Sequence, residues 1–91
     1  MAVQVRVTSV IEKVVNGQRA FEAEGGTVAE LIADIERRYP GFLEQIADET
    51  GALRRFVNLY LNDEDIRYLE GMETALADGD TVSILPAVAG G

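Results

Sequence analysis

The sequence predicts an α+β fold in which one main helix packs on a mixed sheet of four to five strands. Three observations predict it: apolar residues alternate with polar ones in four separate segments, a single longer segment has its apolar residues at helical spacing, and turn residues separate the segments. The order of elements is ββαβ(β)β, and no segment repeats. A chain of 91 residues corresponds to one domain.

The chain opens with two strands. In residues 3–8, Val3, Val5 and Val7 alternate with polar residues, which is typical of a strand with one buried face. Asn16-Gly17 is a strong turn signal, and residues 18–23 read as the second strand of a β-hairpin. The register of this hairpin stays open, because residues 9–18 are compatible with more than one pairing.

A helix follows. Thr27 can cap its first turn, while Glu30, three residues later, can reach back to the N–H of the cap. Arg37 and Arg38 lie near its end, where the helix dipole favours cations, and a Pro-Gly pair at 40–41 stops it. One face of this helix carries the predicted core stripe, which consists of Val28, Leu31, Ile32, Ile35 and Tyr39.

The second half of the chain supplies the remaining strands. Residues 42–51 predict a short helical turn, and residues 54–62 a clear strand. The aliphatic side of that strand, Val57, Leu59 and Leu61, is expected to face the helix. Its other side carries Phe56, Asn58 and Tyr60, where the aromatic residues serve either strand propensity or an interaction surface.

The last strand is expected at residues 81–85, after a short segment at 66–68 and a tight turn at 78–80. Val82 and Ile84 point inward, whereas Ser83 and Leu85 share the outer face with the aromatic residues. Pro86 has no N–H and marks the point where the strand leaves the sheet. The sequence therefore predicts a folded domain over residues 1–86 and a flexible tail over residues 87–91.

Composition excludes several functions. Sixteen acidic against eight basic residues give a net charge of −8, which opposes nucleic acids and anionic membranes and suits either plain solubility or a partner with a basic surface. Without Cys or His, thiolate nucleophiles, catalytic triads and Cys/His zinc sites are excluded. The acidic turn at residues 62–73 has Arg67 where a calcium loop needs glycine. We expect no metal site and no enzymatic activity.

The sequence shows no pattern typical of a membrane-spanning segment or of a signal peptide. No apolar run approaches the roughly 20 residues that cross a bilayer. The first ten residues alternate and lack the apolar stretch of a signal peptide. The sequence therefore predicts a cytoplasmic protein.

Three stretches carry a resemblance to a known family: "GTVAELIADIERRYPG" at residues 26–41, "VNLYLNDEDI" at 57–66 and "LADGDTVSILPAVAGG" at 76–91. Together they resemble the ThiS/MoaD family of sulfur carriers, which have the ubiquitin-like β-grasp fold. The pattern DGD-x-V-x-x-x-P followed by a terminal Gly-Gly is its most specific part, since a terminal Gly-Gly alone also fits a frayed end. Within the family, residues 55–71 and 83–91 look closest to a carrier of cysteine biosynthesis.

The resemblance implies a function for the terminal carboxylate of Gly91. A partner of the MoeB/ThiF type, an adenylating sulfurtransferase, activates this carboxylate with ATP, and sulfur replaces the AMP to give a thiocarboxylate. The implied acceptors are a PLP-dependent cysteine synthase or another biosynthetic enzyme, such as one that makes a thiosugar, and a metalloprotease releases the product. The carrier itself binds no cofactor.

The tail residues fit a partner's active site. Ala87 to Gly91 span about 16–18 Å when extended. Gly90 and Gly91 have no Cβ and can pass a narrow channel, with Ala89 and Ala87 adding little bulk. Val88 serves either as an anchor of register or as a contact that closes the core. We expect the tail from Pro86 to Gly90 to bind the partner, together with an outer sheet surface of Phe56, Tyr60 and Leu85 bordered by acids at 63–65.

Other functions use the same tail. A ubiquitin-like modifier would join Gly91 to a target lysine, although Lys13 is the only lysine of this chain and leaves little basis for lysine-linked chains. A small subunit of molybdopterin synthase would insert the tail permanently into a catalytic subunit, and a thiamin-thiazole carrier would give its sulfur to a different acceptor. A plain interaction module with an idle tail is the remaining alternative.

Overall fold

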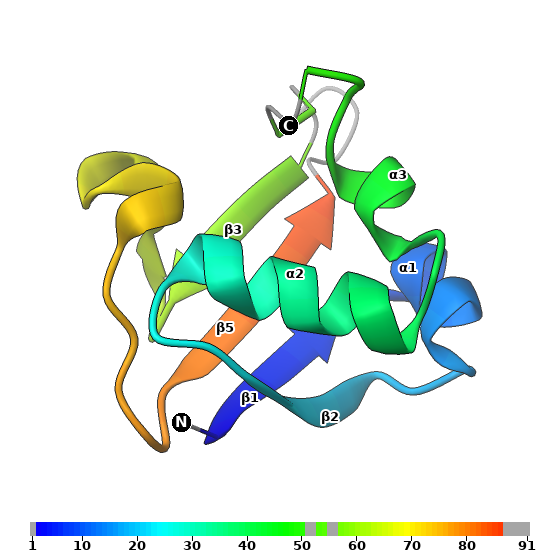
Figure 1. Ribbon diagram of the computed structural model, residues 1–91, viewed down its shortest axis with the longest axis horizontal. Coiled ribbons are helices and arrows are strands. Elements are labelled where there is room, and N and C mark those ends of the chain that lie inside the picture. Colours follow the sequence, from blue (N-terminus) through cyan, green and yellow to red (C-terminus); the bar gives the residue numbers. More distant parts are fainter. Residues whose placement is uncertain (1, 51–52, 55–56, 87–91) are drawn as a thin grey trace.

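A computed structural model of the chain describes residues 2–50, 53–54 and 57–86. Its centre is a five-stranded sheet in the order β2-β1-β5-β3-β4, with helix α2 lying across one face (Figure 1). β1 and β5 run parallel, and every other neighbouring pair is antiparallel, so the sheet is mixed as predicted. The strands are β1 (Ala2–Val7), β2 (Ala20–Glu24), β3 (Val57–Leu61), β4 (Glu64–Asp65) and β5 (Thr81–Pro86).

The helical segments cover the α2 side of the sheet and its ends. α2 (Val28–Arg38) is the main helix, and α3 (Phe42–Ile46) follows it after a short turn, which confirms both predicted helical segments. Figure 1 shows α3 and α1 at the same end of the molecule. The short segments are α1 (Ser9–Glu12) and the 3₁₀ helices η1 (Lys13–Val15), η2 (Ile66–Tyr68) and η3 (Gly71–Glu73).

The connection between the first two strands contains helical turns. β1 and β2 pair antiparallel, with Val5 opposite Phe21, which confirms the predicted pairing. Residues 9–15 of this connection form α1 and η1, so Asn16-Gly17 ends a 3₁₀ turn instead of joining two strands directly, and β2 begins at residue 20 rather than 18. The reason is burial: residues four apart in a helical turn share a face, which brings both Ile11 and Val15 into the core.

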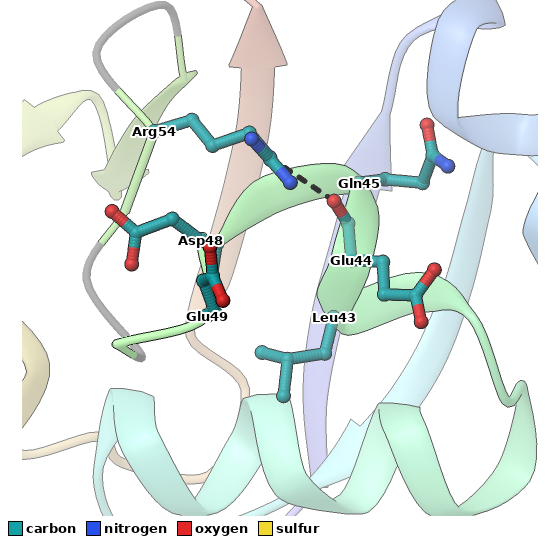
Figure 2. Close-up of a pocket in the computed structure, with 7 residues that line it drawn as sticks. Leu43, Glu44, Gln45, Asp48, Glu49 and Arg54 are labelled. Atoms are coloured by element: carbon teal, nitrogen blue, oxygen red, sulfur yellow. Dashed lines mark hydrogen bonds between the residues drawn. The ribbon is translucent and has the colours of Figure 1, made fainter.

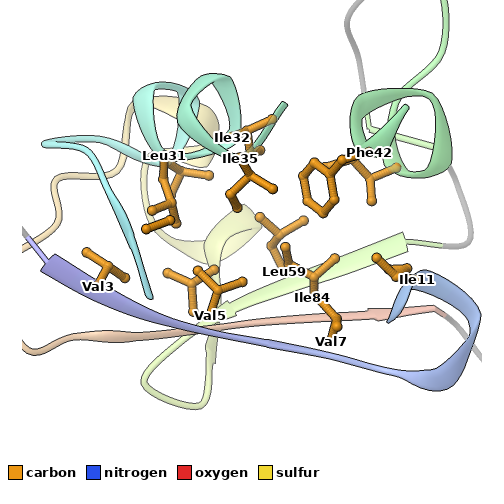
Figure 3. Close-up of a cluster of buried hydrophobic side chains, with 14 of the residues drawn as sticks. Val3, Val5, Val7, Ile11, Leu31, Ile32, Ile35, Phe42, Leu59 and Ile84 are labelled. Atoms are coloured by element: carbon orange, nitrogen blue, oxygen red, sulfur yellow. The ribbon is translucent and has the colours of Figure 1, made fainter. Parts of the chain in front are cut away.

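The hydrophobic core lies between α2 and the facing side of the sheet (Figure 3). The predicted stripe of α2 is buried, and it packs over Val5, Leu59 and Ile84 from three neighbouring strands. Tyr39, the last residue of the stripe, is partly buried and meets the Phe21 ring edge-on, with ring centroids 5.5 Å apart. The inward positions predicted for β3 and β5 are therefore confirmed.

Two side chains hold α2 at its start and along its length. Thr27 Oγ1 accepts a hydrogen bond from Glu30 N at 3.2 Å, which confirms the predicted cap. The Glu30 carboxylate accepts from Gly26 N at 2.8 Å, one residue before the N–H that we expected. Asp34 is nearly buried, accepts from Glu24 N at 2.9 Å and pairs with Arg38 at 3.1 Å, so it ties α2 to the edge strand β2.

Gly25 marks the closest approach between the β2–α2 connection and the helix. A Cβ at Gly25 would lie 2.5 Å from Leu31 N and 2.8 Å from Leu31 Cα. Because a backbone neighbour cannot move aside, Gly25→Ala is expected to lower the free energy of unfolding by about 1–3 kcal/mol, measured by urea denaturation. Gly26→Ala is the matched control, since its Cβ would meet only the Glu30 carboxylate, at 3.1 Å. Equal unfolding midpoints for the two variants would contradict this prediction.

Candidate functional site

The predicted site divides into a part that the structure describes and a part that it does not. Gly91, Gly90, Ala89, Val88, Ala87 and Phe56 lie outside the described residues, so their roles stay predictions. The described part consists of the strand that leads to the tail and the outer face of the sheet. The strand fixes the position at which the tail begins, and the outer face of the sheet forms the surface around that position.

β5 holds the origin of the tail in the middle of the molecule. It is flanked by β1 on one side and β3 on the other, and Val82 and Ile84 are fully buried beneath α2. The ladder with β3 extends to Pro86, which lies opposite Val57. A segment that follows Pro86 is therefore attached to a central strand, and its starting point is fixed relative to the whole domain.

Tyr60 and Leu85 share the outer face of the sheet, as predicted. They line a shallow hollow of about 240 Å³ together with Ser83 and Asp63. Tyr60 lies opposite Ser83 in the β3–β5 ladder, which places the phenol ring beside the last strand. Asp63 confirms that one of the predicted acids borders this surface.

A second hollow adjoins the first and is bordered by arginines, of which Arg19 is paired with Glu12 at 2.9 Å. It measures about 440 Å³, and its lining includes Arg6 and Arg19 as well as Ser83 and Leu85. Arg6 reaches this position because it lies opposite Ser83 in the parallel β1–β5 pair. Sequence reasoning missed both arginines: alternation places Arg6 on the outer side of β1, but only the neighbourhood of β1 and β5 brings it to Leu85.

The acids at 63–65 differ in their surroundings. The side-chain hydrogen bond from Arg67 holds the pKa of the Asp65 carboxyl below its ordinary value of 3.8, and the two groups form an ion pair at 2.8 Å. Arg67 also donates to the side-chain oxygen of Asn58 on β3. Asp63 and Glu64 form no salt bridge with any residue that the structure describes. The acidic border of the surface therefore rests on these two residues, with Asp65 already neutralised.

A hollow on the helical side of the sheet was not foreseen from the sequence. Figure 2 shows it beside α3, with Arg54 reaching across to the helix, where its Nε donates to the Glu44 carbonyl at 3.1 Å. The volume is about 590 Å³. The lining residues are Leu43, Glu44, Gln45, Ala47, Asp48, Glu49 and Arg54.

Within residues 2–50, 53–54 and 57–86, the acidic side chains form no group of three that could hold a metal ion. In the same residues, every helix is too short or too polar to cross a membrane.

Comparison with known proteins decides the family. Residues 6–91 match the model of the ThiS family. The chain belongs to the ThiS family. Over 93 aligned residues it is 46% identical to the sulfur carrier protein CysO of Mycobacterium tuberculosis, covering 100% of each chain. The relatives of this ThiS-family chain thus include proteins named as sulfur carriers, and the predicted resemblance to the sulfur carriers of this family is confirmed.

Solved structures confirm the ubiquitin-like β-grasp fold of this ThiS-family member. The crystal structure of M. tuberculosis CysO matches with a TM-score of 0.89 and 44% identity, covering 94% of this chain and 99% of the other. The CysO chain in the crystal structure of the Amycolatopsis orientalis BexX/CysO complex matches with a TM-score of 0.90 and 44% identity, covering 98% and 99%.

Proposed function

We propose that this protein is a sulfur carrier whose Gly91 carboxylate is adenylated and then converted to a thiocarboxylate. The observation that carries the proposal is the full-length identity to CysO, 46% over both chains. It is supported by the β-grasp fold, in which a central strand leads directly toward the terminal glycines.

The chemistry suits a chain without Cys or His. A carboxylate is a poor electrophile, because its charge repels nucleophiles and oxide is a poor leaving group. Attack of the Gly91 carboxylate on the α-phosphorus of ATP forms an acyl adenylate and releases pyrophosphate. Sulfide (HS⁻) delivered by the partner then attacks the acyl carbon, the bond to the AMP phosphate breaks, and AMP leaves while the thiocarboxylate stays on Gly91. No side chain of the carrier takes part in bond making, so the partner supplies the catalysis and consumes the ATP.

The fold contributes reach and docking. Five residues past Pro86 extend about 16–18 Å, which lets Gly91 enter a buried active site while the domain stays outside. Tyr60 and Leu85 offer apolar contact area on the outer face, and Asp63 and Arg6 lie on opposite sides of them. Charges of both signs around an apolar centre favour one orientation of the partner.

The partners follow from the same proposal. The first is an adenylating sulfurtransferase of the MoeB/ThiF type. The second is a sulfur-accepting enzyme, either a PLP-dependent cysteine synthase or another biosynthetic enzyme, followed by a metalloprotease in the cysteine route. The BexX/CysO complex supports a separate partner protein, since a CysO there is bound to a second protein.

The mass of the intact protein, isolated from its own cells, tests the proposal. Replacement of one oxygen by sulfur adds about 16 Da to the chain. Treatment with an alkylating reagent should then label the thiocarboxylate, because the chain has no cysteine to react. Large covalent adducts through Gly91 would instead identify a modifier, and co-purification with a second protein at fixed stoichiometry would identify a permanent subunit.

The outer face is tested by replacing its aromatic residues. Phe56→Ser together with Tyr60→Ser should weaken binding to the adenylating enzyme by about tenfold or more, because aromatic anchors dominate interface energies. Tyr60 lies outside the buried core of the described residues, and far-UV circular dichroism of the double variant checks that its fold is retained. Isothermal titration calorimetry gives the affinity.

Tyr68→Ser provides the matched control for this pair. Tyr68 is 84% exposed and lies on η2, so it tests whether removal of any surface tyrosine has the same effect. Unchanged affinity of the double variant would exclude the outer face as the docking surface.

A further inference from the structure

An apolar groove lies beside the start of β3 and shares no lining residue with the two outer-face hollows. Its volume is about 310 Å³. It is formed where β3 meets the 3₁₀ turns η2 and η3. The lining residues are Leu53, Arg54, Val57, Ile66, Arg67, Gly71 and Met72.

The groove is one strand away from the origin of the tail. Val57 lines the groove and lies opposite Pro86 in the β3–β5 ladder. The chain beyond Pro86 consists of five residues, Ala-Val-Ala-Gly-Gly, in which Val88 is the single side chain larger than a methyl group. Val88 can lie up to about 7 Å and Gly91 up to about 16–18 Å from Pro86. Both therefore come within reach of a site that borders Val57.

Arg54 lines both this groove and the hollow beside α3, and its guanidinium extends toward α3 (Figure 2). Its main chain is tied down, because Arg54 N donates to the Ile46 carbonyl at 2.9 Å and Val57 N donates to the Arg54 carbonyl at 3.0 Å. Its Nε is occupied by the Glu44 carbonyl, but its two terminal nitrogens bond to no residue that the structure describes. Arg67, the other guanidinium of the groove, is already paired with Asp65. Among the described residues that line the groove, Arg54 is therefore the guanidinium without a carboxylate partner.

We propose that, in the carrier without a partner, residues 87–91 fold back across the end of β3, with Val88 in the apolar groove and the Gly91 carboxylate on Arg54. In this arrangement the apolar groove covers the apolar Val88 side chain, and the terminal carboxylate pairs with a guanidinium that forms no salt bridge with a described residue. Because the tail is attached to the domain through Pro86, its binding to the groove is intramolecular. The effective concentration of the tail at the groove is in the millimolar range, so a weak contact is enough to populate the docked state.

The docked tail is a resting position of the carrier. A partner that draws Gly91 into its active site must first displace Val88 and the carboxylate from the groove. Adenylation needs only the released tail, so this inference goes beyond the proposed function and can fail while the carrier function stands.

Methyl NMR of the full chain tests the resting position. The chain has two methionines, Met1 and Met72. A variant with Met72 replaced by leucine therefore assigns the Met72 methyl signal, because that signal disappears from its spectrum. We expect a nuclear Overhauser effect between the Val88 methyls and the Met72 methyl. Val88→Ser should move the Met72 signal to the position of an empty groove.

Charge variants test the second half of the contact. Arg54→Gln should lower the ratio of docked to free tail by roughly fivefold to tenfold, the effect of losing one partly exposed charge-assisted hydrogen bond. The full chain with a C-terminal amide on Gly91 should shift the Met72 signal in the same direction, with no side chain changed. Lys13→Gln, which removes a positive charge on η1, is the control and should leave the signal in place.

Two results would overturn the proposal. The first is a Met72 signal at the same position in the wild type, in Val88→Ser and in the C-terminal amide, together with no nuclear Overhauser effect between the Val88 and Met72 methyls. The other is a Met72 signal that ignores the tail and moves only when the adenylating enzyme is added, because the groove would then bind a partner. In both cases the mass of the thiocarboxylate would still report on the carrier function separately.

Discussion

Deletion of Gly91, or Gly91→Ala, should abolish activation of the carrier without changing its fold. The reacting carboxylate would be withdrawn by one residue in the deletion and crowded by a Cβ in the substitution. A displacement of about 1 Å at a reacting centre can cost about 100-fold in rate, and a whole residue exceeds that. The measurement is the amount of acyl adenylate or thiocarboxylate formed by the adenylating enzyme, read by intact mass.

Ala89→Gly is the matched control for the terminal variants. It changes a neighbouring tail residue by the same methyl group but keeps the length of the chain and the carboxylate. Far-UV circular dichroism and urea midpoints should be equal in all three proteins, because the folded elements end at Pro86 in the described structure. Full adenylation of the protein that lacks Gly91 would refute the role of the terminal carboxylate.

Phe42→Ala should cause the largest loss of stability among single substitutions considered for this protein. Phe42 is fully buried at the start of α3 and packs in the core between α2 and the sheet (Figure 3). Loss of a buried phenylalanine costs about 3–5 kcal/mol, a large part of the roughly 5–14 kcal/mol expected for a domain of this size. The thermal midpoint should fall by about 12 °C or more, measured by circular dichroism.

Leu43→Ala separates burial from helix formation. Leu43 is the next residue of α3 but is 37% exposed at the hollow of Figure 2. Its replacement by alanine keeps a good helix former and removes less buried surface, so the midpoint should shift much less. Equal shifts for the two variants would mean that Phe42 does not contribute to the core as its burial indicates.

The sequence by itself determined the main helix α2 and the strands β1, β2, β3 and β5. Period-two alternation in β1, β3 and β5 and helical spacing in α2 predict which residues are buried, because the side-chain direction follows from local backbone geometry. The cap at Thr27 involves residues three apart, so it too is a local property. The terminal glycines are visible in the printed sequence, and the family to which they point is confirmed.

Only the tertiary structure decided which surfaces these elements form together. The parallel neighbourhood of β1 and β5 brings Arg6 to Ser83, and the turns η2 and η3 close a groove against Val57. The alternation of apolar and polar residues predicts on which face of the sheet a residue lies, but it does not predict which strand is the neighbour of that residue's strand. The strand order is settled by how α2 and the sheet bury their apolar surfaces jointly, a balance of contacts between residues far apart in the chain.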